Sequence, residues 1–181
     1  MNRPMTHHRQ PLLALAAGLA LAGPCCSPAG GQAAPPPQLL PVTAQWCLPQ
    51  AGATPVGSSP VCIGLEVART PQQQIWGLQR RAKLPPLRGM WFPYSTPTPV
   101  RFWMHLTPEP LDMLFVSNEQ VVAVVANATP CMRLPCRNYG PGVPVDGVIE
   151  LAGGEAARLG IRSGSPAVIL PMATPLPASG R

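Results

Sequence analysis

The chain has 181 residues, and proline (27) and glycine (17), which suit helix and strand interiors poorly, make up about a quarter of it. Hydrophobic residues account for 46% and charged residues for only 11%, which supplies one modest core and excludes long coiled coils and highly charged disordered chains. Thirteen Lys and Arg against seven Asp and Glu give a net charge of +6, an excess too mild to indicate nucleic-acid binding.

The N-terminal segment has the order of features found in secretory signal peptides. Arg3 and Arg9 precede an eleven-residue apolar run over residues 12–22. This run is too short for a membrane span, which needs about 20 residues. Small residues then lead to Ala33, after which we expect cleavage. The sequence therefore predicts that residues 1–33 are a signal peptide.

Lipid attachment is the competing interpretation of the same segment. Cys25 ends a Leu-Ala-Gly-Pro-Cys stretch that resembles a bacterial lipobox, although Pro24 fits that pattern poorly. We expect cleavage rather than a lipid anchor, which places the mature protein in the periplasm or outside the cell. No other apolar stretch is long enough to span a membrane, so we expect no membrane span after signal removal.

Cleavage after residue 33 would leave four cysteines, an even number that indicates disulfides in an exported chain. Three pairings are possible, and proximity in the sequence favours Cys47–Cys62 and Cys131–Cys136. A zinc site is disfavoured because the nearest histidine, His105, is distant in the sequence. A redox pair normally has two intervening residues, whereas four separate Cys131 from Cys136.

Proline and glycine content divides the remaining chain into three parts. Residues 34–60 are expected to be a proline-rich linker or arm, residues 61–172 a folded domain, and residues 173–181 a disordered tail. The domain begins with apolar residues alternating with others over residues 61–67, which is typical of a half-buried strand.

A short helix is the next predicted element. Thr70 at the N-cap, a proline at the first helical position and Gln73 at the third form a capping box. We expect the helix over residues 71–80, with Ile75 and Leu78 as its buried contacts.

Short strands dominate the rest of the domain, and two of them form a predicted hairpin over residues 111–125. The pattern favours a mainly β (α+β) fold, a compact antiparallel sheet that curls into a partly closed barrel or sandwich with one or two short helices. The remaining strands are expected near residues 89–92, 100–106, 147–151 and 167–170, and a second helix near 153–160.

Several segments, in their order along residues 61–170, are similar to the domain-of-unknown-function 192 family of small, often exported bacterial and archaeal proteins. This resemblance implies a compact, mainly antiparallel β domain and no particular activity. Where the family usually has Phe-Trp-Met-Lys-Asn-Thr, residues 102–107 read Phe-Trp-Met-His-Leu-Thr. The segments that carry the resemblance are Trp76–Arg81, Gly89–Phe92, Phe102–Met104, Pro110–Val116, Pro130–Cys136 and Val148–Ile161.

Five side chains are candidate ligand-binding residues. One predicted strand carries three of them in alternation: Arg101, Trp103 and His105. Asp112 follows on the next strand. A cation, an indole, an imidazole and a carboxylate can therefore meet in one site. The structural alternative is that Trp103 covers the mouth of the barrel and Asp112 orients the turn. Glu150 is either a further site residue or a solvent-facing strand residue.

Three functions remain open at this stage. The leading hypothesis is a non-enzymatic, monomeric module that binds a small ligand or an envelope protein, with no nucleic acid, metal or cofactor. An envelope enzyme, of a hydrolytic kind, that uses Asp112 and His105 is the alternative. A copper-binding protein is the further alternative, because exported thioether and imidazole sites favour Cu(I), although methionines on apolar strand positions usually fill core gaps. Its ligands would come from His105 with Met90, Met104, Met113 and Met132.

Overall fold

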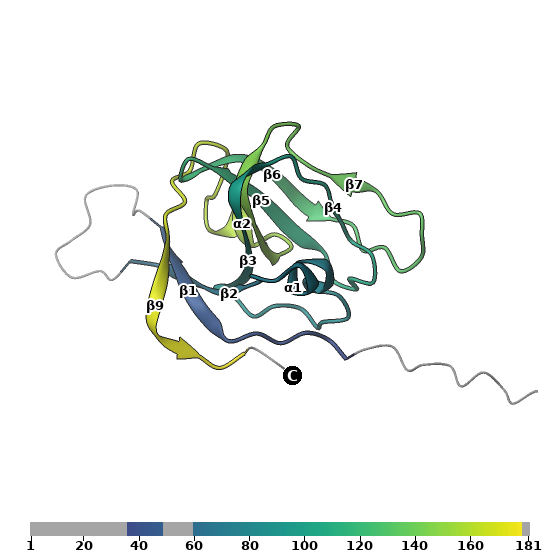
Figure 1. The fold of residues 1–181 in the computed structure, drawn as a ribbon, viewed down its shortest axis with the longest axis horizontal. Coiled ribbons are helices and arrows are strands. Elements are labelled where there is room, and N and C mark those ends of the chain that lie inside the picture. The colour runs from purple at the N-terminus through teal and green to yellow at the C-terminus, as the bar shows by residue number, and fades with distance from the viewer. Residues whose placement is uncertain (1–35, 49–59, 179–181) are drawn as a thin grey trace, which may run out of the picture. The chain divides into compact units, whose positions relative to one another are not determined.

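The computed structural model describes residues 36–48 and 60–178, which form two sheets and two short helices (Figure 1). In chain order the elements are β1 (Val42–Cys47), β2 (Cys62–Val67), α1 (Pro71–Trp76), β3 (Arg88–Thr98), β4 (Phe102–Trp103), β5 (Leu111–Ser117), β6 (Gln120–Ala128), β7 (Asn138–Tyr139), β8 (Val145–Ala152), α2 (Glu155–Arg158) and β9 (Ile169–Leu176). The large sheet has the order β6-β5-β8-β3-β2-β1-β9, and β4 pairs with β7. The mainly β prediction is therefore confirmed.

The antiparallel expectation needs one correction, because β2 and β3 run parallel. Helix α1 and the loop after it return the chain to the end of the sheet at which β2 began, so β3 starts beside the start of β2. The other pairs of the large sheet are antiparallel. The described part of the chain forms a mixed sheet and no closed barrel.

Strands β1 and β9 extend the sheet beyond the expected domain boundaries at residues 61 and 172. Strand β1 lies in the predicted linker, and Val42, Ala44 and Trp46 on one of its faces are buried. Strand β9 pairs with β1 and continues to Leu176, inside the predicted tail. It is an edge strand, which is where prolines are tolerated in a sheet.

Helix α1 begins as predicted and ends early. The Thr70 hydroxyl accepts from the Gln73 N–H and the Gln73 side chain accepts from the Thr70 N–H, so the capping box is confirmed. Gly77 ends the helix with a φ of 46°, in the left-handed region that favours glycine. Leu78 is buried as expected. Ile75 is 62% exposed, so the prediction that it is a buried contact of the helix was wrong.

The predicted hairpin is confirmed as β5 and β6. Ser117 pairs with Gln120 across a two-residue turn formed by Asn118 and Glu119, both with positive φ. Two central residues with positive φ match the right-handed twist of the flanking strands.

The strand expected over residues 100–106 is much shorter in the structure. Only Phe102–Trp103 form β4, and Leu106 turns the chain with a φ of 54°. Arg101 and His105 therefore lie outside the strand, so the three side chains do not alternate along one strand as expected.

Both faces of the large sheet are covered by apolar clusters. On one face Met113 and Phe115 of β5 pack with Val148 of β8, and on the other Leu114 packs with Ile149. The residues of β5 from Leu111 to Val116 are consequently all buried, instead of alternating between buried and exposed. Glu150 occupies the same face as Val148, because side chains two residues apart on a strand share a face.

Both expected disulfides form. Cys47–Cys62 joins directly opposed residues of β1 and β2, and Cys131–Cys136 closes a short ring after β6. Disulfides are compatible with export. The predicted signal segment lies outside the described residues. Among the residues described, no helix combines the length and apolar character needed to cross a membrane.

The two disulfides should differ in their contribution to stability. In the chain-entropy model, the 15-residue separation of Cys47–Cys62 contributes about 3 kcal/mol and the 5-residue separation of Cys131–Cys136 about 2 kcal/mol. We expect paired Cys→Ser variants to lower the free energy of unfolding in this order, measured by urea denaturation. The Cys131→Ser/Cys136→Ser variant should stay folded and become sensitive to protease within residues 126–147. Unchanged proteolysis there would show that packing holds the loop.

Candidate functional site

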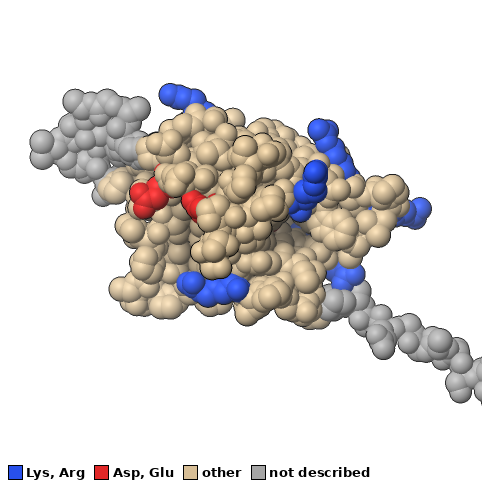
Figure 2. All heavy atoms as spheres, turned by 45° about the horizontal axis from the view of Figure 1, so that its top comes forward, with Lys and Arg blue, Asp and Glu red and all other residues tan. Residues whose placement is uncertain are grey.

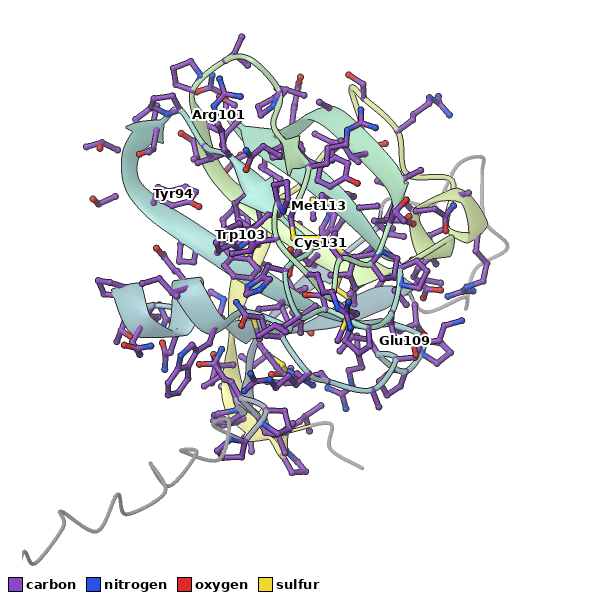
Figure 3. All side chains as sticks on the ribbon, turned by 90° about the vertical axis from the view of Figure 1, so that its right-hand side faces the viewer. Tyr94, Arg101, Trp103, Glu109, Met113 and Cys131 are labelled. Carbon is purple, nitrogen blue, oxygen red and sulfur yellow. A yellow bond between two sulfur atoms is a disulfide. The ribbon has the colours of Figure 1, made fainter. Side chains whose placement is uncertain are left out.

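A pocket lies between helix α1 with its following turn, strands β3 and β4, and the middle of β8. Its volume is about 40 Å³, room for about three water molecules. Figure 3 shows Trp103 lying between Tyr94 and helix α1 in this view. The lining residues are Gln74, Ile75, Trp76, Gly77, Leu78, Gln79, Phe92, Phe102, Trp103, Thr107 and Glu150.

The mouth of the pocket is apolar and aromatic. Ile75, Trp76 and Trp103 are 62%, 39% and 45% exposed. Behind them, the rings of Phe92 and Phe102 meet edge to face with centroids 5.2 Å apart, which is a favoured geometry. Exposed apolar side chains gathered around a concave site are typical of a binding surface.

Glu150 places a carboxyl group in the wall of this pocket. Its register partners are Met90 on β3 and Met113 on β5, both fully buried, so an apolar row surrounds it. The residue is only 4% exposed. Its carboxyl group accepts no hydrogen bond from a described residue, and its oxygens keep access to the pocket, because Arg88 Nη1 is the one fully buried side-chain polar atom without a partner among the described residues. Burial among these side chains raises the pKa of Glu150 to about 8. Burial, with the Glu150 charge as a lesser cause, also raises the pKa of the Tyr94 hydroxyl to about 12.

Three further polar side chains of the pocket donate hydrogen bonds to backbone carbonyls. The Gln74 amide nitrogen donates to two backbone carbonyls, at 3.0 and 3.3 Å. The Gln79 amide nitrogen donates to one at 2.9 Å, and the Thr107 hydroxyl to one at 3.4 Å. Their oxygens have no partner among the described residues, so these three side chains present acceptors.

Asp112 does not belong to this pocket. Its carboxylate accepts hydrogen bonds from the backbone N–H groups of Asn127 (2.8 Å), Gly154 (3.1 Å) and Ala156 (2.8 Å). No hydrogen bond joins it to His105 within the described structure. Asp112 therefore connects β5 to β6 and to the start of α2, and the expected acid–base pair does not form.

The remaining candidates separate as well. The His105 ring lies 5.3 Å from the Trp103 ring, centroid to centroid, outside the pocket lining. Arg101 lines a different hollow beside Gly140 and Gly142, and Figure 3 shows it well away from Trp103. Of the five candidates, only Trp103 and Glu150 line this pocket, and His105 lies beside Trp103 outside it.

Three of the four methionines of the copper hypothesis are buried core residues, and the fourth, Met132, is exposed. Met90, Met104 and Met113 are at most 1% exposed and belong to the apolar core on the Glu150 face. Within residues 36–48 and 60–178, no group of three or more His, Cys, Asp or Glu side chains is arranged to hold a metal ion.

Most of the pocket's other residues were not among the candidates. A signal that could have pointed to them is Trp76, which directly precedes Gly77, a glycine able to end the helix before residue 80. An aromatic residue at such a position, on a helix that exposes Ile75, is available to line a groove. Phe92 and Thr107 give no comparable signal, because only the fold brings them to the pocket.

A mixed β sheet with a β2–α1–β3 crossover and a pocket beside that crossover defines this protein as a small mixed-sheet β domain. The chain belongs to the DUF192 family, described as "Uncharacterized ACR, COG1430", whose model matches residues 54–169. The resemblance expected from the sequence is thereby confirmed.

Two crystal structures resemble this chain in fold and sequence. One is a protein of Sinorhizobium meliloti 1021 described as a "putative transcription regulator", with 27% identity and a TM-score of 0.59 over 74% of this chain and 97% of that one. The other is a protein of unknown function from Novosphingobium aromaticivorans DSM 12444, with 30% identity and a TM-score of 0.58 over 83% of this chain and 94% of that one. No curated protein matches.

Substitution of Asp112 should lower stability. In Asp112→Asn one acceptor oxygen becomes an amide that faces backbone N–H donors, so buried donors are left without partners. We expect the free energy of unfolding to fall by about 3 kcal/mol, measured by urea denaturation. A loss below about 0.5 kcal/mol would contradict a structural role for Asp112.

The raised pKa of Glu150 predicts a pH-dependent stability. The unfolded carboxyl keeps its ordinary pKa of 4.5, so between about pH 4.5 and 8 the folded state holds one more proton than the unfolded state. Stability should therefore fall as pH rises through this window, by up to about 1.4 kcal/mol per unit. Glu150→Gln cannot ionise and should lack this slope in urea denaturation across the window. Parallel curves for the two proteins would contradict the prediction.

Proposed function

We propose that this protein is an exported, non-enzymatic binding module that holds a small ligand in the Glu150 pocket. The observation that carries this proposal is the buried carboxyl group of Glu150, which has no described hydrogen-bond partner and lines a pocket. A carboxyl group that reaches water only through a small pocket is poorly solvated, and a ligand that supplies a hydrogen-bond partner recovers part of the lost free energy. An aromatic mouth with few polar groups inside is the usual construction of a small-molecule site.

Binding is favoured over catalysis by the chemistry of the lining. Glu150 is the one ionisable side chain among the described lining residues, so no second acid or base stands beside it. General acid–base catalysis of hydrolysis needs a positioned group to give or take a proton, and commonly two. Asp112, the acid of the enzyme hypothesis, is already bound by three backbone N–H groups.

The charge distribution favours a small molecule over nucleic acid as the partner. Figure 2 shows Lys and Arg side chains spread around the visible face, without one continuous basic patch. Nucleic-acid sites concentrate basic side chains on one face to contact successive phosphates. We further propose that the protein acts as a monomer in the periplasm or outside the cell.

A ligand screen followed by nitrogen–proton NMR correlation spectra tests the proposed function. We expect active small molecules to shift the signals of residues 74–79, the Trp103 indole and Thr107, and not those of distant strands. Trp103→Ala should weaken binding about tenfold or more, because it removes an aromatic side of the mouth.

Leu170→Ala is the control, since Leu170 is similarly exposed (50%) and lies on β9 away from the pocket lining. It should leave binding unchanged. Shifts that spread over both faces of the sheet, or equal losses in the two variants, would overturn the proposal.

A further inference from the structure

We propose that the ligand of the pocket is a protonated amine, whose ammonium group contacts Glu150 and whose carbon atoms lie against Trp76 and Trp103. This inference rests on the proposed function and names the chemical class of the ligand. Three independent features of the pocket lead to it: the sign of its charge, the direction of its hydrogen bonds and its aromatic walls.

The charge of the pocket is opposite to that of the protein. The described residues include ten Lys and Arg, yet none of them lines the pocket. Its one ionisable lining residue is Glu150. A cation that enters meets a carboxylate within low-dielectric surroundings, where the attraction between opposite charges is stronger than in water. An anion would meet the same carboxylate with no cation beside it.

The hydrogen-bonding groups of the lining also favour a cation over an anion. Gln74 and Thr107 donate to backbone carbonyls, Gln79 does so with one of its two N–H donors, and the oxygens of all three remain as acceptors. Ionised Glu150 is also an acceptor only. The remaining donors of the lining are the second Gln79 N–H and the indole N–H groups of Trp76 and Trp103, so acceptor oxygens outnumber donors. A ligand that donates several hydrogen bonds suits this lining, and an alkylammonium group donates up to three.

Aromatic rings supply the third feature. Trp76, Phe92, Phe102 and Trp103 all line the pocket. Their faces attract cations, most strongly in the case of tryptophan, and this attraction grows when the cation leaves water. Room for about three water molecules suits an ammonium head and its nearest carbon atoms. Any longer part of the ligand would extend along the exposed mouth.

Binding of a cation should be coupled to release of a proton. Glu150 must ionise to form the ion pair, and its raised pKa of about 8 means that it is mostly protonated at neutral pH. Tyr94 on β3 is the titratable neighbour coupled to it, while β4, β5 and α1 contribute uncharged lining or neighbouring residues. Affinity for an amine should then rise with pH, by up to about tenfold per unit below pH 8.

The test compares ligands that differ in charge and little in shape. The cation 3,3-dimethylbutylammonium and its neutral counterpart 3,3-dimethylbutan-1-ol form one pair, n-butylammonium and 1-butanol a second, and butyrate is the anionic probe. Each is titrated into the full chain at constant ionic strength, at a pH of about 9 where Glu150 is ionised, and binding is followed by tryptophan fluorescence and NMR shifts. We expect at least one cation to bind about tenfold or more tightly than its neutral counterpart.

Glu150→Gln separates the charge of the site from its shape. The variant should lose the preference for the cation and the pH dependence while still binding the neutral compound. Glu119→Gln, which removes an exposed carboxylate in the β5–β6 turn, should behave as the wild-type protein. At a pH of about 7, where Glu150 is mostly protonated, calorimetry in two buffers of different ionisation enthalpy should show proton release for wild type and none for Glu150→Gln. Thermal melts confirm that both variants are folded.

The outcomes separate this inference from the proposed function. If the neutral compounds or butyrate bind in the pocket as tightly as the cations or more tightly, the amine proposal is overturned. The proposal of a binding module would still be supported. A cation preference that persists in Glu150→Gln would also overturn it, because surface charge would then be the cause. If no probe of any charge shifts the pocket signals, the amine proposal fails, and a positive screen with other chemistry would still support the binding module.

Discussion

Burial of carboxyl groups is the constraint on which this structure depends. Four of the seven acidic residues are buried, and a buried charge costs several kcal/mol unless polar partners surround it. Glu66 accepts from both terminal nitrogens of the buried Arg81, at 2.7 and 2.9 Å, and Asp112 accepts from three backbone N–H groups. Glu155 accepts from the Leu87 N–H and from Arg158, whose hydrogen bond lowers the pKa of Glu155. Each of these three carboxylates links segments that are distant in the sequence.

The same bonds position the pocket. Arg81 follows the turn after α1, so its pairing with Glu66 of β2 holds the segment that carries Trp76 and Gln79 against the sheet. The Gln38 amide adds a second tie by donating to the carbonyl of Gly77 at 3.3 Å. A six-residue helix has little stability of its own. The geometry of the mouth therefore depends on these tertiary bonds, while the floor is a rigid central strand.

Local signals made parts of the fold predictable, and long-range contacts determined the rest. The capping box at Thr70 and the turn at Asn118 involve neighbouring residues, so the sequence identifies them directly. The role of Asp112 could not be derived, because its partners lie 15 to 44 residues away. Glu150 was ambiguous for another reason. Strand β8 is covered on both faces, so the alternation that would separate a buried from an exposed position is missing.

Glu150 differs from the other buried acids because the fold provides it with no described hydrogen-bond partner. Its neighbours in register are methionines, and an apolar residue of similar size would fill the same space without the cost of desolvation. Protonation reduces the desolvation cost of Glu150, because a carboxyl group with a pKa of about 8 is mostly neutral at pH 7. A neutral acid is still a polar group facing an aromatic pocket. Its presence lowers the stability of the empty domain, and such a loss is characteristic of functional sites, where binding and stability place opposite demands on one residue.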